Sequence, residues 1–161
     1  MEAARSGDRR RLRIGSALAL GIALTITVVH ALARAQEPEP TLQELAARGD
    51  LARLSRALAE GAPVDERDED GRTALHVAAK VGRLFAVMML VTKGADPNAR
   101  DDQKRTPLHL AADGDRRSEA ERFQIVKLLI SEGADRRAED AKGNRPVDYA
   151  RVPEFEAALA P

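Results

Sequence analysis

The spacing of apolar residues along the second half of the chain predicts short helices. Apolar residues recur at helical intervals over 84–92 and over about 119–131. In the first of these segments Met88 and Met89 are expected to fill gaps in the core, because Met adapts to irregular packing. In the second, the candidates for burial are Ile125, Val126, Leu128 and Leu129. No segment alternates apolar and polar residues for long enough to form a lasting strand, so we expect an all-α body.

Glycines mark the ends of the predicted helices. A glycine after such a run can take the left-handed conformation that ends a helix at little cost. This position is occupied by Gly61, Gly94 and Gly133. Short hairpin-like turns are expected after each of them, over 65–71, 98–104 and 138–143.

The same pattern returns at a regular interval along the chain. Residues 70–79 match residues 103–112, at an offset of 33, in the Thr, Leu, His and both Ala positions. Further along, residues 93–96 match residues 132–135 at an offset of 39, so six additional residues lie before Phe123. A fixed period of this length is typical of solenoid proteins, whose repeats bury a shared core by stacking.

These residues resemble the ankyrin repeat, whose pattern is G-x-T-P-L-H-x-A-A. The pattern is complete from Thr106 to Ala112, with Lys104 in the position of the leading Gly, and it recurs over 71–79 with Ala74 in place of Pro. The resemblance implies an all-α ankyrin-repeat solenoid of about four helix–turn–helix units with short hairpin turns. We expect this domain to span 41–161, with approximate repeats 41–67, 68–100, 101–139 and 140–161.

The most regular polar residues of the repeats have structural roles in this interpretation. Thr73 and Thr106 are suited to cap the first helix of their repeats. The resemblance further implies that His76 and His109 bond the capping Thr and the backbone of the neighbouring repeat. Neither imidazole is then left over for catalysis or for metal binding.

The two end units carry polar substitutions that suit capping repeats, because a terminal repeat must expose one face to water. The first unit lacks the T-P-L-H sequence and presents Gln43, Glu44, Arg48 and Arg53 instead. The last unit has Arg145 in place of Thr and Asp148 in place of His.

The first 35 residues have the order of a secretory signal peptide. A basic start precedes an uncharged, largely apolar run over 14–29, and small residues then alternate up to Ala35. Cleavage is predicted between Ala35 and Gln36, with the Ala31 and Ala33 pair as a second option. Residues 36–40 are expected to form an extended linker. Alternatively, an uncleaved segment counted on through Ala33 would reach the length of a membrane anchor.

Composition narrows the classes of function. The first 35 residues contain six arginines and two acidic residues, whereas the remainder holds 20 basic and 24 acidic residues. A body with this small acidic excess offers no broad electrostatic footprint for nucleic acid. One Tyr, three Phe and no Trp leave few aromatic walls for base stacking or a ligand pocket, and the absence of Cys excludes thiol chemistry.

We expect no catalytic residue, no metal and no cofactor. The motifs G-x-S-x-G and H-E-x-x-H and the P-loop are absent from the sequence. An acidic turn invites a calcium interpretation, although the EF-hand spacing is missing and a solvated loop tip is the preferred one. This turn contains Asp65, Glu66, Asp68, Glu69 and Asp70.

The resemblance implies that a partner protein binds the turn tips and the exposed face of the first helices. Mixed charges there favour a polar interface with electrostatically steered association. The alternative is that these are ordinary solvated residues. The candidate partner-binding residues are Glu69, Asp70, Arg72, Lys80, Val81, Arg100, Asp102, Gln103, Arg105, Asp113, Lys142 and Asn144.

The additional residues around 113–122 contain Ser118-x-x-Glu121, a capping-box pattern. We expect them to lengthen the second helix of their repeat by more than one turn, at the edge opposite the hairpin tips. Two interpretations stay open, a partner contact and a tolerated extension in a surface loop.

Together these features predict an exported, non-enzymatic and monomeric protein–protein interaction module that is periplasmic or secreted. Its partner would be another protein, not nucleic acid, and it would touch a membrane only through an uncleaved N-terminal segment. One alternative is an inner-membrane-anchored scaffold that faces the periplasm. Another is a small enzyme or divalent-metal-dependent protein that uses the acidic turn.

Overall fold

The computed structural model describes residues 39–113, 119–151 and 153–160. These residues form seven α-helices and one 3₁₀-helix, and no strand occurs among them. The predicted signal segment over 1–35 lies outside the described residues. Within the described part of the chain, no helix is long and apolar enough to cross a membrane. The elements are α2 (Leu42–Arg48), α3 (Leu51–Ala59), α4 (Ala74–Val81), α5 (Leu84–Thr92), α6 (Pro107–Asp113), α7 (Glu119–Ser131), η2 (Pro146–Tyr149) and α8 (Pro153–Leu159).

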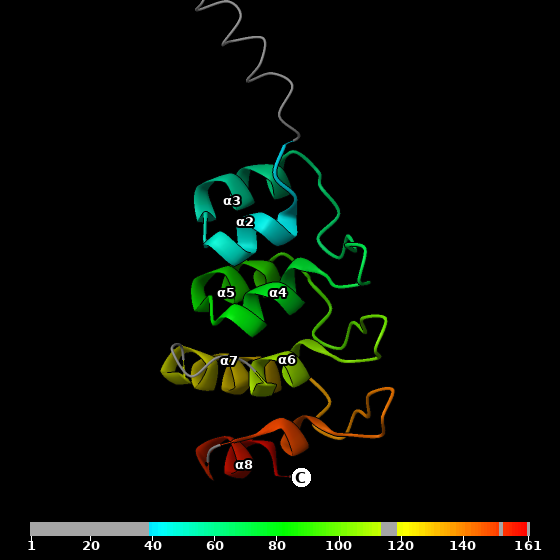
Figure 1. Cartoon of the computed structure of the whole chain (residues 1–161). Helices are drawn as coiled ribbons and strands as arrows, with labels where there is room; N and C mark the ends of the chain where they lie inside the picture. The colour runs from blue at the N-terminus through cyan, green and yellow to red at the C-terminus, as the bar shows by residue number, and fades with distance from the viewer. Residues whose placement is uncertain (1–38, 114–118, 152, 161) are drawn as a thin grey trace, which may run out of the picture. The chain divides into compact units, whose positions relative to one another are not determined.

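The helices form four antiparallel pairs that stack one on another (Figure 1). The first helix of each pair is α2, α4, α6 or η2, and the second is α3, α5, α7 or α8. The second helices α5 and α7 coincide with the segments predicted from apolar periodicity. The predicted all-helical solenoid of helix–turn–helix units is therefore confirmed.

Small residues let the first helices lie close together. Ala78, Ala79 and Ala111 are fully buried between neighbouring pairs, and contacts are denser along the row of first helices than along the row of second helices. Leucines on the inner side of each pair, such as Leu75 and Leu108, are also fully buried. Because one pair alone would leave this apolar face in water, stacking is what creates the core.

Between successive pairs the chain makes an extended turn that projects from one edge of the stack, to the right in Figure 1. We call residues 65–72 the first tip, 98–105 the second tip and 137–144 the third tip. Neighbouring tips are joined by backbone hydrogen bonds, from Asp102 N to Asp70 O at 3.2 Å and from Ala141 N to Gln103 O at 2.9 Å. The three predicted turns therefore form one continuous edge.

Two expectations about individual residues were wrong. Gln43 was expected to be a solvated capping residue, but it is buried because its side chain donates to backbone carbonyls of the first tip, Glu66 O at 2.8 Å and Arg72 O at 3.3 Å. Met88 was expected to fill the core, but it is 46% exposed on the outer side of α5, whereas Met89 does pack against the core.

The second helix of the third pair is longer than its counterpart. With the offset of 39, α5 corresponds to 123–131, so α7 begins four residues earlier, at Glu119. The predicted N-terminal lengthening is confirmed at about one turn, and Figure 1 shows it at the edge opposite the tips. The Ser118 half of the predicted capping box lies outside the described residues.

Replacement by alanine should destabilise the protein to different extents at two tip glycines that have similar backbone angles. Gly71 and Gly143 have φ of 72° and 80°, but an added Cβ on Gly71 would lie 2.3 Å from Asp102 Oδ1, whereas one on Gly143 meets nothing within 4 Å. Gly143→Ala should cost only the left-handed penalty of about 1 kcal/mol. Gly71→Ala should cost about 2 kcal/mol or more in the free energy of unfolding, measured by urea denaturation. Equal losses in the two variants would contradict this account.

Candidate functional site

The two predicted structural histidines lie inside the stack. His76 Nδ1 lies 3.2 Å from Thr73 N and 3.0 Å from Thr73 Oγ1, and Nε2 lies 3.0 Å from the carbonyl oxygen of Arg105 in the second tip. His109 repeats this arrangement with Thr106 and with Asn144 O at 3.1 Å. Each ring therefore joins the start of its own helix to the end of the next tip, the two contacts that the resemblance implies.

The end repeats carry variants of the same device. Gln43 occupies the position of His76 one repeat earlier, and it donates to Arg72 O, the counterpart of Arg105 O. Asp148 occupies the position of His109 one repeat later, where it accepts from Arg145 N at 2.7 Å and so retains only the helix-capping half. The column of buried side chains formed by His76 and His109 thus begins with the amide of Gln43. At the other end of the stack, Asp148 keeps the helix-capping contact without the contact to a following tip.

Both imidazoles are held in one neutral form. A carbonyl oxygen can only accept, so the Nε2 that faces it must carry the proton, and a backbone N–H can only donate, so Nδ1 must be bare. Both rings are fully buried, and this burial lowers the pKa of His76 and of His109 below the usual 6.5. The rings are therefore structural donors, with no lone pair free for a metal or a substrate.

A column of aspartates holds the tips in shape. Asp68, Asp101 and Asp140 occur at the repeat offsets of 33 and 39. In each, Oδ1 accepts from the backbone N–H groups two and four residues later, at 2.8–3.0 Å. Oδ2 of Asp68 and of Asp101 binds Arg72 and Arg105, respectively. These carboxylates close the turns.

At the third tip the aspartate has a tyrosine as partner. The Tyr149 hydroxyl donates to Asp140 Oδ2. Although burial opposes ionisation, the hydrogen bonds from Tyr149, Asn144 N and Lys142 N lower the pKa of Asp140 to about 2. Asp140 is thus a fully engaged anion and is not available to a ligand.

Further side chains join successive tips in register. Arg67 donates to the carbonyl oxygen of Arg100, and Arg100 in turn donates to Glu139 O at 2.9 Å. Asn98 accepts from Asp135 N at 2.7 Å and donates to Gly133 O at 2.9 Å. Part of the hydrogen-bonding capacity of Arg67, Arg100 and Asn98 is thus used within the molecule. Fewer groups are therefore left for a partner than the sequence suggests.

Six of the predicted partner-binding residues are engaged within the chain. Arg72 and Arg105 bind their tip aspartates at 2.9 and 2.7 Å, and Asp70 pairs with Arg72 at 2.8 Å. The others are Arg100, Asp113, which pairs with Arg151 at 3.3 Å, and Asn144.

The other six predicted partner-binding residues point to solvent. Their side chains form no hydrogen bond or ion pair with any residue that the structure describes, and all are exposed. Four of them lie on the tips, and the other two lie at the C-terminal end of α4. They are Glu69, Lys80, Val81, Asp102, Gln103 and Lys142.

The acidic turn does not assemble a metal site among the described residues. No group of three His, Cys, Asp or Glu side chains in 39–113, 119–151 and 153–160 is placed to hold an ion. Asp68 is bound to Arg72, and Asp65 accepts from Asp96 N at 3.2 Å. Two of the five carboxylates of the turn are thus used to fix the first tip.

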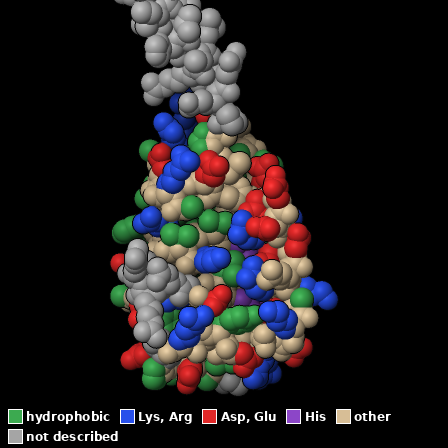
Figure 2. Space-filling view, viewed as in Figure 1, with side chains coloured by type: hydrophobic (Ala, Val, Ile, Leu, Met, Phe, Trp, Pro, Cys, Tyr) green, Lys and Arg blue, Asp and Glu red, His purple; other side chains and the backbone are tan. Residues whose placement is uncertain are grey.

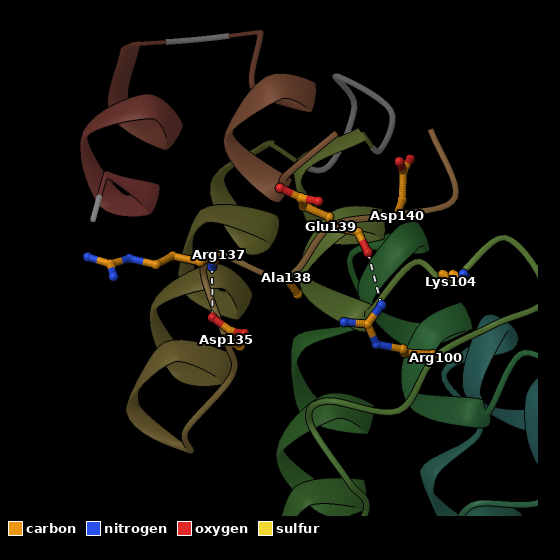
Figure 3. A pocket seen from close by; sticks show the side chains of 7 residues that line it. All are labelled: Arg100, Lys104, Asp135, Arg137, Ala138, Glu139 and Asp140. Atoms are coloured by element: carbon orange, nitrogen blue, oxygen red, sulfur yellow. Dashed lines mark hydrogen bonds between the residues drawn. The ribbon is translucent and has the colours of Figure 1, made fainter. Parts of the chain in front are cut away.

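A polar cavity of about 420 Å³ lies between the second and third tips. Figure 3 shows Arg100 and Lys104 on the right, Asp135 on the left, Ala138 between them and Asp140 above Lys104. The side chains of Arg137 and Glu139 are directed away from Arg100 in this view. Lys104 was not among the predicted partner-binding residues.

A second, smaller cavity of about 330 Å³ lies at the opposite edge, and Phe85 and Glu121 contribute to its lining. Phe85 is 69% exposed. Next to this edge Arg122, the fourth residue of the α7 extension, is buried, and it donates to Ala111 O at 2.7 Å near the end of α6. The extension thus has a structural contact, and the sequence alone did not reveal it.

Several of these residues could have been found by repeat arithmetic. The aspartate column recurs at offsets of 33 and 39, Arg67 and Arg100 recur at the offset of 33, as the histidines do, and Gln43 falls on the histidine position. Lys104 could have been noticed as the one departure from glycine between Gly71 and Gly143. The exposure of Phe85 carries no such signal, because apolar periodicity does not reveal which positions lack a neighbour.

Comparison with known families agrees with this geometry. A family model described as "Ankyrin repeats (3 copies)" matches residues 42–140. A search of curated proteins gave no match.

The neutral histidines make stability depend on pH. Below about pH 6.5 the unfolded chain binds protons at both imidazoles while the folded chain resists them, so the free energy of unfolding should fall as pH falls. The limiting slope is about 1.4 kcal/mol per pH unit for each ring. The lowered pKa values of Asp68 and Asp140 act only below about pH 4, so urea denaturation from pH 7.5 to 5 isolates the histidines.

The matched control for this prediction is the double variant His76→Gln/His109→Gln. An amide can still donate to the carbonyl, as Gln43 does, but it does not titrate. The variant should be less stable at neutral pH and should lose the slope between pH 6.5 and 5. A slope that persists in the variant would show that other groups cause it.

Proposed function

The chain belongs to the ankyrin-repeat family, whose repeats form protein–protein interaction modules, and on that premise we propose that it is an exported, non-enzymatic binding protein. The observation that carries the proposal is the face formed by the tips and the first helices. On this face the scaffold leaves Glu69, Lys80, Asp102, Gln103 and Lys142 without internal partners. Side chains that are exposed and not needed for the fold are the ones that a partner can use.

At two positions of the tips the charge of the side chain changes from one repeat to the next. At one tip position the residues are Asp70, Gln103 and Lys142, and the preceding position has Glu69, Asp102 and Ala141. At these two positions the charge thus runs from acidic at the first tip to a single Lys at the third. Over whole tips, 65–72 carries five acidic and two basic residues, 98–105 two acidic and three basic, and 137–144 two of each. Figure 2 shows acidic side chains gathered at the upper right, over the first tip. A partner with the opposite gradient would be attracted and aligned in one direction along the stack.

Engagement of the ionisable residues supports a non-enzymatic role. Both described histidines are buried as neutral donors, and the tip aspartates are bound by backbone N–H groups and by arginines. General acid–base chemistry needs a titratable group that faces a substrate. The groups left on the proposed face are carboxylates, lysines and an amide in open solvent, where they serve recognition.

The proposed export depends on the sequence of the first 35 residues. A basic start, an uncharged run over 14–29 and small residues up to Ala35 follow the order that the export machinery recognises. Retention of the same segment would give a membrane-anchored scaffold with the same binding face. The binding function does not depend on which of the two occurs.

Capture of a partner tests the binding proposal. The full-length gene product, tagged at its C-terminus and recovered from an extracytoplasmic fraction, should retain a specific protein. Glu69→Lys and Lys142→Glu should each slow association with that protein about fivefold at low salt, and less at high salt. Kinetics of binding to the captured partner give the measurement.

The control variants are Lys93→Glu and Glu132→Lys, which make the same charge changes after α5 and α7, away from the first helices. They should leave association unchanged. Arg72 and Arg105 are unsuitable for this test, because reversing them would disrupt their tips. If no specific partner is retained, the binding proposal fails. If a partner is retained but Glu69→Lys and Lys142→Glu bind like the parent protein, the assigned face is wrong.

Processing of the N-terminus tests the proposal of export. N-terminal sequencing of the protein recovered from its native compartment should begin at Gln36. A replacement of Ala35 by a bulky residue such as Trp should block or shift cleavage, because the site requires small residues. Recovery of the intact chain from Met1 in the soluble cytoplasm would contradict export, and recovery from the membrane fraction would favour the anchored scaffold.

A further inference from the structure

Lys104 has a backbone conformation that the other two tips assign to glycine. Its φ is 58°, and among the described residues it is the one non-glycine residue with a positive φ. The equivalent residues are Gly71 and Gly143, with φ of 72° and 80°. A side chain in this conformation is unfavourable relative to glycine. The second tip therefore carries a lysine at a position where the backbone conformation favours glycine.

Neighbouring residues explain why a side chain fits there. On Gly71 a Cβ would collide with Asp102 Oδ1 at 2.3 Å. Repeat arithmetic places Ala141 beside Lys104 in the position that Asp102 has beside Gly71, and Ala141 N bonds Gln103 O. The small side chain of Ala141 removes the obstacle. The available space explains why a side chain is tolerated, but not why it is lysine. The ammonium group forms no hydrogen bond or ion pair with any described residue, so the fold does not require it.

The lining of the cavity beside Lys104 carries three cationic and three anionic side chains, and of the anionic ones Asp135 and Asp140 are hydrogen-bonded within the molecule while Glu139 is directed away from Arg100 (Figure 3). Asp140 is saturated by two backbone N–H groups and the Tyr149 hydroxyl. Asp135 accepts from Arg137 N at 2.8 Å. Arg100 uses Nη1 for Glu139 O, so its other guanidinium N–H groups remain, together with the Lys104 ammonium.

We propose that Lys104 and Arg100 form a subsite between the second and third tips that binds a carboxylate of an acidic segment in the partner protein. This inference rests on the proposed binding function and extends it to the chemistry of the partner. The subsite lies at the second tip, whose residues 98–105 carry three basic and two acidic side chains, and away from the first tip with its acidic excess. An acidic segment would be repelled from the first tip and not from the second. A carboxylate accepts from an ammonium and a guanidinium at once, which accounts for both groups.

The strain at Lys104 provides a sharp test, because stability and binding should change in opposite directions. Lys104→Gly should raise the melting temperature of the full-length protein by about 3 °C. The same variant should weaken binding of an acetylated tetraglutamate peptide at least fivefold. The affinity is measured by NMR titration, with shifts expected at residues 100, 104 and 137–139.

Two further variants separate charge from backbone. Lys104→Ala removes the ammonium and keeps the left-handed conformation, so it should lose binding without the gain in melting temperature. Lys93→Ala removes one positive charge after α5, outside the cavity lining and away from the proposed face, and it should keep the affinity within about twofold. Equal losses in Lys93→Ala and Lys104→Ala would reduce the effect to general attraction and would overturn the subsite.

Several other results would overturn the proposed subsite or, separately, the proposed function. The proposal is overturned if tetraglutamate causes no shifts up to its solubility limit, or if tetralysine shifts the same residues. Inorganic phosphate that displaces the peptide at the same total charge would indicate a simple anion site and would also overturn it. A captured partner that binds Lys104→Gly and Lys104→Ala as tightly as the parent protein would refute this inference alone. Failure to capture any partner would instead refute the proposed function.

Discussion

A buried side chain near the start of each of α2, α4 and α6 donates a hydrogen bond to a backbone carbonyl of the following tip, and the rest of the structure depends on this bond. Without it, the carbonyl groups of Arg105 and Asn144 would keep only their bonds from Asp101 N and Asp140 N, and each lost hydrogen bond would cost about 1 kcal/mol. In α4 and α6 the imidazole ring also bonds the capping threonine. The bond to the carbonyl therefore couples the start of one helix to the end of the next tip. Each repeat is thereby placed relative to its neighbour.

The tips add a second layer of internal bonding to this column. Asp68, Asp101 and Asp140 close the turns, while Arg67 and Arg100 connect each tip to the next. Exposed charge is therefore a poor guide to function in this protein, since much of it maintains the shape of the surface. What remains for recognition is the set of side chains that the two layers do not use.

The sequence was sufficient for the fold and for part of the site. Periodicity located α5 and α7, and the offset of 33 located the repeats, because burial of one helical face imposes a spacing that can be read directly. It misplaced Gln43 and Met88, since residue type alone does not say whether a neighbour covers a position. It also counted Arg72 and Arg105 as free, although their bonds to Asp68 and Asp101 depend on turn geometry that only the structure supplies.

The repeats themselves separate scaffold from recognition. Positions that keep one residue type at every offset, such as the tip aspartates, serve contacts that every repeat must make. Positions that change, such as Asp70, Gln103 and Lys142, cannot serve a shared contact and are free to differ. Because each repeat touches only its neighbours, a locally unfavourable residue such as Lys104 burdens one tip and leaves the column intact. A solenoid can therefore acquire a specific contact at a single tip, and the cost stays within the stability of that repeat.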